Sequence, residues 1–141
     1  MIKILIATFL FIGIIEAKQN YGNIIVDEVV SVYDGDTFRV NINSYPPIIG
    51  KKMSIRLNGV DTPEMRGKCS KEKQLARKAK QLTVSKLRGA KKIELRNMQK
   101  GKYFRIVADV YVDNKSLASI LIKKDIAVKY TGGTKVKDWC H

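Results

Sequence analysis

Three extended segments occupy the first half of the chain. Residues 24–33 and 37–43 are rich in β-branched side chains, and apolar and polar positions alternate through residues 53–60. A period of two predicts strands with one buried face. Asp34 and Gly35 lie in the gap between the first two segments, and this pair predicts a hairpin whose tight turn requires a positive φ.

The periodicity changes to that of a helix after residue 69. Within residues 70–87, the apolar side chains that fall near one helical face are Leu75, Ala79, Leu82 and Leu87, and lysines cover the rest of the surface. This predicts an amphipathic helix with Ser70 as its N-cap and Gly89 as its stop. Beyond the helix, we expect a strand at residues 92–97, a turn at 98–101 and a second strand at 105–112. A short terminal helix is expected at residues 116–124.

This order of elements predicts one α+β domain. Three strands, a helix, two strands and a C-terminal helix is the order of a five-stranded OB-fold β-barrel with a helix between strands 3 and 4. A chain of 141 residues has the size of a single domain with its own core. The domain is expected to cover residues 18–141 and to end in a glycine-containing loop from residue 130.

The first seventeen residues have the pattern of a signal peptide. Lys3 precedes an apolar run over residues 4–15, and Ala17 is a small residue suited to cleavage. A membrane anchor is the alternative, but the run is shorter than the roughly 20 apolar residues of a spanning helix. We therefore expect a periplasmic or secreted protein without stable membrane association after cleavage.

The composition adds a strong positive charge. The chain has 27 basic and 13 acidic residues, and since residues 1–17 hold one of each, the formal charge of +14 belongs to the domain. A domain this basic attracts nucleic acid or anionic envelope polymers. A lysine-rich surface that only maintains solubility is the alternative.

Cys69 and Cys140 are the two cysteines of the chain. In an exported protein a lone pair of cysteines usually forms a disulfide, so we expect these two to be bonded. Zinc binding is not expected, because the two cysteines and His141 lack the paired spacing of zinc sites.

Four carboxylates gather in two short turns at strand ends, Asp34 and Asp36 in one, Asp61 and Glu64 in the other. Hard oxygen ligands are those that Ca²⁺ and Mg²⁺ prefer, so the clustering indicates a divalent cation site. The spacing is not that of an EF-hand, and ordinary turn and cap roles are the alternative.

Arg56 and Arg105 lie within expected strands. A guanidinium binds two phosphate oxygens at once and keeps its charge at any relevant pH, which suits both residues to phosphate binding. An exposed barrel face, or ion pairs with the carboxylates, is the alternative.

Three motifs in succession resemble the signatures of the staphylococcal nuclease family. They are Asp34-Gly-Asp-Thr37, Ile55-Arg-Leu-Asn-Gly-Val-Asp-Thr-Pro-Glu64, and Lys102-Tyr-Phe-Arg105 followed by Val107-Ala108. The resemblance implies a nuclease that depends on Ca²⁺ and hydrolyses DNA and RNA with little sequence specificity. It further implies metal-assisted attack of water, products with 3′-phosphate ends, and an enzyme that we expect to be a monomer.

The resemblance also implies a role for each residue at the metal. Asp36 and Asp61 match the carboxylates that bind Ca²⁺, and Thr62 matches the residue that contributes its main-chain carbonyl. Asp34 matches a carboxylate that acts through water. The implied calcium site therefore joins both acidic turns.

Further implied roles concern the substrate. Glu64 matches the residue that holds the attacking water, while Arg56 and Arg105 match the arginines that bind the scissile phosphate. Arg105 is also expected to favour departure of the 5′ oxygen. Lys102 and Tyr103 resemble positions that contact nucleotide phosphates.

The chain departs from the family pattern next to Arg105. Phe104 replaces the usual Gly or Gln, and Gly101 stands where an acidic residue is common, so the loop that aims Arg105 is expected to differ. Residues 44–52 and the tail also differ, so the aromatic contacts to a base are not assigned, and Tyr130 is one candidate. The paired cysteines resemble those of exported relatives in Gram-negative bacteria, which favours the periplasm.

Two other classes of function compete with the nuclease. One is a non-catalytic binding module of the same fold, and the other is a cationic secreted protein that acts on membranes. The first would not need the acidic and arginine residues that this sequence keeps, and the second would leave the carboxylate turns without a role.

Overall fold

The computed structural model describes residues 18–141. The expected signal peptide, residues 1–17, lies outside the described residues and stays a prediction. Within the described part of the chain, no helix has the length and hydropathy needed to cross a membrane.

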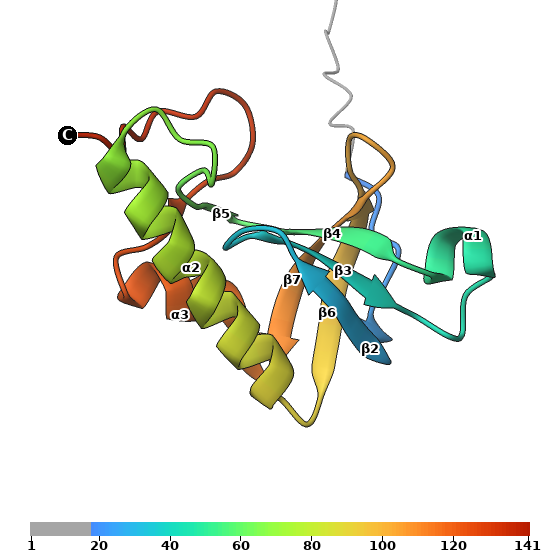
Figure 1. The fold of residues 1–141 in the computed structure, drawn as a ribbon. Helices are drawn as coiled ribbons and strands as arrows, with labels where there is room; N and C mark the ends of the chain where they lie inside the picture. The colour runs from blue at the N-terminus through green and yellow to red at the C-terminus, as the bar shows by residue number, and fades with distance from the viewer. Residues whose placement is uncertain (1–17) are drawn as a thin grey trace, which may run out of the picture.

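The fold is a mixed α+β domain built on one curled sheet and three helices (Figure 1). The sheet has the order β1-β6-β7-β4-β3-β2, with β8 added to β7, and β5 and β9 pair separately. The strands are β1 (Ile24–Ile25), β2 (Glu28–Val32), β3 (Thr37–Asn41), β4 (Met53–Leu57), β5 (Val60–Asp61), β6 (Ile93–Lys100), β7 (Ile106–Val112), β8 (Lys115–Ser116) and β9 (Val128–Lys129). The helices are α1 (Pro47–Gly50), α2 (Ser70–Gly89) and α3 (Leu117–Lys123).

The sheet curls because its two edge strands are consecutive in the chain. β1 pairs with β6 and β2 pairs with β3, and only Val26 and Asp27 separate β1 from β2. Val26 N donates to Ile93 O at 3.0 Å on one side, and Asp27 N donates to Asn41 O at 3.0 Å on the other. The segment expected to be one strand is therefore bent, and it links the two edges as in an OB-type barrel. This confirms the expected fold class.

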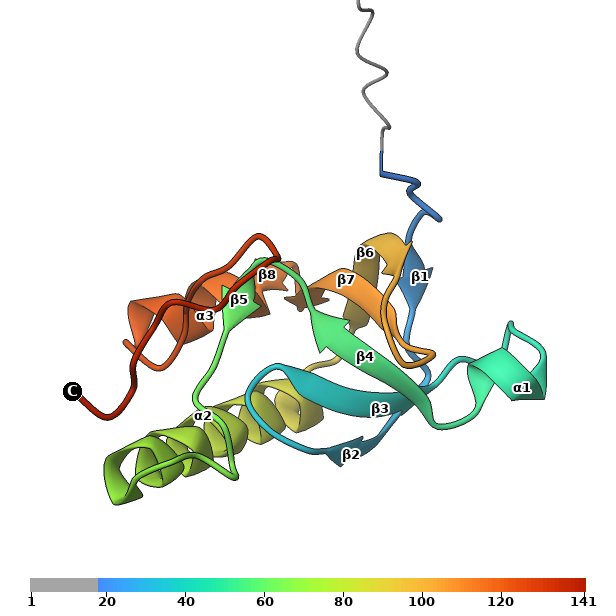
Figure 2. The ribbon, with the colours of Figure 1, turned by 90° about the horizontal axis from the view of Figure 1, so that it is seen from above.

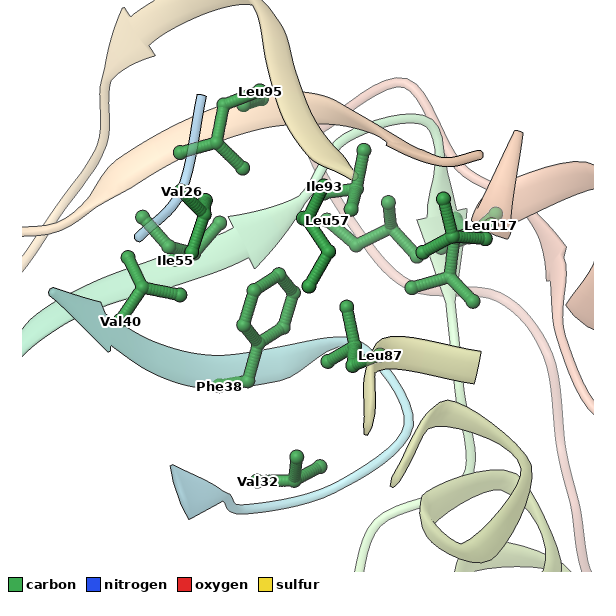
Figure 3. Close-up of a cluster of buried hydrophobic side chains, with 14 of the residues drawn as sticks. Val26, Val32, Phe38, Val40, Ile55, Leu57, Leu87, Ile93, Leu95 and Leu117 are labelled. Carbon is green, nitrogen blue, oxygen red and sulfur yellow. The ribbon is translucent and has the colours of Figure 1, made fainter. Parts of the chain in front are cut away.

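The core fills the inside of the curl (Figure 3). Phe38 of β3 and Ile55 and Leu57 of β4 are fully buried there, and Leu87 of α2 and Leu117 of α3 close the end where these two helices lie side by side (Figures 1 and 2). Burial of such a side chain contributes about 1.5–3 kcal/mol of hydrophobic free energy. The expected alternation of β4 is confirmed, and it turns Arg56 away from this core.

The turn expected at residues 98–101 is wrong. β6 continues to Lys100 through a register shift between Arg96 and Gln99, where Asn97 adopts a φ of 51°. The chain stays extended because Met98 is buried in the core, and asparagine tolerates the left-handed conformation that such a bulge requires. The reversal follows instead at residues 101–105.

The hairpin between β2 and β3 is confirmed, but the expected positive φ at Gly35 is wrong. Glycine is required there by close packing. A Cβ at Gly35 would lie 2.8 Å from Ala79 Cβ of α2 and 2.9 Å from Thr62 Cγ2. Thr83 Oγ1, also on α2, donates to Gly35 O at 2.7 Å. The acidic turn is thus fixed directly on the helix.

Helix α2 begins at Ser70 itself, so its N-cap lies one residue earlier than expected, and a disulfide fixes this end. Cys69 rather than Ser70 is the N-cap, since its Sγ accepts from Glu72 N at 3.4 Å, and the helix ends at Gly89 as expected. Cys69 is bonded to Cys140, as the cysteine count predicted, and the bond spans 71 residues. The C-terminal tail is therefore attached to the start of α2.

Candidate functional site

A hollow of about 300 Å³ lies where four parts of the fold meet: the β2–β3 turn, β4, the loop after β5, and the end of the β6–β7 loop. The C-terminal tail forms a fifth wall. The lining residues are Tyr33, Asp34, Asp36, Thr37, Arg56, Glu64, Arg105, Tyr130 and Lys135. The structure therefore brings five residues of the expected site to one space, although they are up to 71 positions apart: Asp34, Asp36, Arg56, Glu64 and Arg105.

The turn that carries Asp34 and Asp36 is held by hydrogen bonds from backbone N–H groups. Asp36 N donates to Asp34 Oδ1 at 3.1 Å, Tyr33 N donates to Thr37 O at 2.9 Å, and Leu57 N donates to Asp36 O at 2.8 Å. Both carboxylates are buried, with exposures of 5% and 4%. Burial raises the pKa of Asp34 to about 7, and the nearby charge of Asp36 adds to the rise.

Asp36 is held by three donors on one oxygen. Arg56 Nη1 lies 2.6 Å from Asp36 Oδ2, and Thr62 donates to the same atom from its backbone N at 3.1 Å and its Oγ1 at 2.9 Å. The other oxygen, Oδ1, accepts only from Thr37 Oγ1 within residues 18–141, at 3.0 Å. Asp36 therefore ties the first acidic turn to the segment of Asp61 and Thr62.

Arg56 bridges the two acidic turns. Strand pairing places it opposite Thr37, and its guanidinium donates to Leu57 O at 3.3 Å and to Val60 O at 3.1 Å. Nη2 lies 3.9 Å from Asp61 Oδ1, a longer contact than that of Nη1 with Asp36. The side chain is only 12% exposed, so these contacts hold its head in one position.

Asp61 and Glu64 differ in exposure. Asp61 is 4% exposed and its Oδ1 accepts no hydrogen bond of acceptable geometry from residues 18–141, while the Glu64 side chain is 52% exposed at the hollow.

Glu72 is a residue that sequence reasoning missed. It holds the loop that leads from Glu64 to helix α2. It accepts from Glu64 N at 3.3 Å and from Lys68 N at 2.9 Å. A glutamate in the first turn of a helix is common, so the sequence carries no signal for this role.

Lys135 was also missed. Its Nζ lies 2.6 Å from Asp61 Oδ1 and donates to Glu64 Oε1 at 3.0 Å. Burial disfavours the charged ammonium, but the contacts with Asp61 and Glu64 outweigh burial and raise the pKa of Lys135. The disulfide at Cys140 was the one sequence feature that could have placed this lysine near the site.

Arg105 reaches the hollow from the end of the β6–β7 loop. Its backbone O accepts from Gly101 N at 2.8 Å, and its buried Nε has no hydrogen-bond partner among residues 18–141. Tyr103 and Phe104 have φ values of 57° and 52° and are 88% and 68% exposed. Lys102 is exposed as well, so the structure does not bring Lys102 or Tyr103 into the hollow, in contrast to Tyr130.

A second hollow of about 350 Å³ lies on the other side of Arg105. It is lined mainly by apolar residues, which include Tyr45, Ile49, Met53 and Phe104, and has no carboxylate in its wall. Its chemistry therefore does not match that of the acidic turns.

A compact metal cage is not found at the acidic turns. Among residues 18–141, the one group of three potential ligands within 4.8 Å of one another is Cys69, Glu72 and Cys140, and its two sulfurs are bonded to each other. At the acidic turns, the side chains of Arg56 and Lys135 lie against the carboxylates.

The chain matches the model of a known family. The model of the family described as "Staphylococcal nuclease homologue" matches residues 54–138, more than half of the chain. A search of curated proteins found no match. The matched range includes Arg56, Asp61, Glu64, Arg105 and Lys135, whereas the first acidic turn precedes it.

Proposed function

Because the chain belongs to the staphylococcal nuclease family, we propose that it is a calcium-dependent hydrolase of DNA and RNA. The observation that carries the proposal is the hollow in which Asp36, Arg56, Glu64 and Arg105 meet. Phosphodiester hydrolysis depends mainly on positioning and on neutralising the charge that develops at phosphorus. Two guanidinium groups beside carboxylates supply both requirements.

The acidic turns fit a hard divalent cation. Asp61 Oδ1 is a buried oxygen without a well-directed hydrogen bond, and Asp36 Oδ1 accepts from a single donor within residues 18–141. In the proposal, Asp36 and Asp61 hold Ca²⁺ through these carboxylates, Thr62 through its main-chain carbonyl, and Asp34 through water. When bound, Ca²⁺ lowers the pKa of a water molecule and neutralises charge on the phosphate.

In the proposal, Glu64 has the role of acting on the attacking water. It is the exposed carboxylate of the site, and its backbone is fixed by the hydrogen bond from Glu64 N to Glu72. In the proposal, Glu64 orients a water molecule and accepts its proton as the oxygen attacks phosphorus.

The arginines bind the scissile phosphate. Arg56 is held by two backbone carbonyls and by Asp36, while the buried Nε of Arg105 has no partner among the described residues. In the proposal, both guanidiniums neutralise the phosphate, and Arg105 favours departure of the 5′ oxygen. The bond from phosphorus to that oxygen breaks, and the products are a 5′-hydroxyl and a 3′-phosphate.

The substrate is bound with little sequence preference in this proposal. The formal charge of +14 attracts any polynucleotide, and phosphate contacts do not read bases. Lys102 and Tyr103 are exposed beside Arg105, where they are free to contact flanking phosphates, and Tyr130 is available to a base. We further propose that the protein acts as a monomer. The Cys69–Cys140 disulfide supports an oxidising compartment such as the periplasm.

Digestion of plasmid DNA and of RNA by the purified protein tests the proposal. Cleavage should stop with a calcium chelator, return with Ca²⁺, and leave ends that a polymerase extends only after phosphatase treatment. Binding without cleavage in Ca²⁺ would instead indicate a recognition module. Leakage of anionic vesicles without cleavage would indicate a membrane-active protein.

A further inference from the structure

Lys135 lies on a tail segment that is fixed at both ends. Tyr130 N donates to Gly59 O at 3.0 Å where the segment leaves β9, and Cys140 is bonded to Cys69 at the other end. Gly132 and Gly133 have φ values of 105° and 79°, which allow the chain to reverse between these two points. The segment therefore returns to the hollow with Lys135 facing it.

The ammonium of Lys135 faces the oxygen that the proposed function assigns to the cation. Its Nζ lies 2.6 Å from Asp61 Oδ1 and 3.0 Å from Glu64 Oε1. The other cation near that oxygen is Arg56, whose Nη2 is 3.9 Å away and whose Nη1 is already 2.6 Å from Asp36. Lys135 is thus the closest positive charge to the buried carboxylate of Asp61 among residues 18–141.

A buried carboxylate requires a partner. Removing an ionised group from water is costly unless an opposite charge or hydrogen bonds replace the solvent. Asp61 is 4% exposed and has no well-directed hydrogen bond on Oδ1 within residues 18–141. The ammonium of Lys135 provides that compensation.

Lys135 is also the cation that can leave. Its side chain is 42% exposed and its head contacts two carboxylates, whereas Arg56 is 12% exposed and donates to two backbone carbonyls as well. A lysine head on a flexible stem gains water when it moves, and a fixed guanidinium does not. A cation that binds Asp61 Oδ1 therefore displaces the lysine and leaves the arginine in place.

We propose that Lys135 is the resident counter-cation of Asp61, and that a divalent cation must displace it in order to bind. The residue thereby sets the affinity of the site for the ion and stabilises the site before the ion arrives. After displacement, Glu64 remains as its carboxylate partner. The identity of Asp61 as a ligand rests on the proposed function.

The test measures calcium binding without a nucleic acid substrate. Isothermal titration with Ca²⁺ should give Lys135→Met a Kd about tenfold lower than that of the wild type. This equals ~1.4 kcal/mol of binding free energy. The Tm of Lys135→Met in chelator should be lower than that of the wild type, and saturating Ca²⁺ should remove the difference. Lys135→Arg, which keeps the charge, should bind no more tightly than the wild type.

Lys137→Met is the matched control. It removes the same charge from the same segment, but Lys137 lies 5.4 Å above the Trp139 ring and forms no ion pair among residues 18–141. Its Kd should stay within twofold of the wild type.

The results separate this inference from the proposed function. If wild type and Lys135→Met bind Ca²⁺ with the same Kd, or if the Lys137 control gains as much affinity, Lys135 is not the counter-cation, and the nuclease proposal stands. If neither protein binds Ca²⁺, the calcium site itself is refuted. If Lys135→Met does not fold, Lys135→Gln replaces it in the comparison, because it also removes the charge but keeps a polar group that can donate to Asp61 and Glu64.

Discussion

Replacement of Gly35 by alanine tests how the acidic turn is held. The added Cβ would lie 2.8 Å from Ala79 Cβ and 2.9 Å and 3.1 Å from Thr62 Cγ2 and Cβ. Ala79 and Thr62 are fully buried, so neither can turn away into solvent. Either the turn moves off helix α2, which stretches the bond from Thr83 Oγ1 to Gly35 O, or the helix shifts.

The expected cost follows from overpacking. Adding a methyl group to a well-packed interior costs about 1–3 kcal/mol, and the loss of chain freedom in the unfolded state returns about 0.4–1 kcal/mol. We expect Gly35→Ala to lose about 1–2 kcal/mol of stability, and for a domain of this size each kcal/mol lowers the Tm by roughly 4 °C. Calcium binding should weaken at least several-fold, since the same turn carries Asp34 and Asp36.

Thermal unfolding and calcium titration of two variants measure this effect. Gly89→Ala is the control, because a Cβ at Gly89 meets nothing within 4 Å and its φ is not positive. Alanine is preferred to glycine within a helix by about 0.5–1 kcal/mol, so the control should be neutral or slightly stabilised. Gly35→Ala should cost less stability in an Ala79→Gly background than in the wild type, because the contact with Ala79 Cβ is then absent. A Gly35→Ala protein with wild-type Tm and Kd would refute the packing argument.

Three further predictions concern the site, the tail and the charged surface. Glu64→Gln should lower turnover at least 100-fold, with a Tm within about 2 °C of the wild type because the side chain is half exposed. A fall in Tm large enough to account for the lost turnover would contradict this. Reduction of the Cys69–Cys140 bond should lower stability by up to about 4 kcal/mol, because it opens a 71-residue loop, and an unchanged denaturation midpoint in reducing agent would argue against it. The pKa of Asp113 is lowered by hydrogen bonds from the N–H groups of Lys92 and Lys91. Its stabilising effect is therefore present above its unfolded pKa and lost as the pH falls through the folded pKa, so the destabilisation caused by Asp113→Asn at pH 7 should shrink as the pH is lowered, as urea denaturation over a series of pH values would show.

The strands and helices could largely be predicted from local patterns. β4 and α2 follow from periods of two and 3.6, since each repeats over several residues with a consistent buried side. The end of β6 could not be predicted, because Met98 is held in the core by contacts with distant residues while its neighbours favour a turn. The bend between β1 and β2 was equally hidden, since it arises from pairing with two different strands.

The candidate site could be predicted as a set of residues but not as an arrangement. The motifs identified Asp36, Arg56 and Glu64, which the fold brings to one hollow, and their roles stay predictions. Lys135 and Glu72 have no local signature, because a lysine in a polar tail and a glutamate in a first helical turn resemble ordinary surface residues. Only the tertiary structure shows that one contacts Asp61 and the other holds the Glu64 loop.

Helix α2 positions both acidic turns with one face. Its buried residues are Glu72, Ala76, Ala79, Thr83 and Leu87. The face expected from the spacing of apolar residues was Leu75, Ala79, Leu82 and Leu87, and it did not include the two polar residues Glu72 and Thr83. Glu72 in the first turn fixes the Glu64 loop, and Ala79 and Thr83 receive Gly35 of the other turn. Seven residues of helix separate Glu72 from Ala79, about 10 Å along the axis. A rigid helix therefore sets the distance between two carboxylate turns that the sequence separates, and polar residues on its inner face are the means by which it does so.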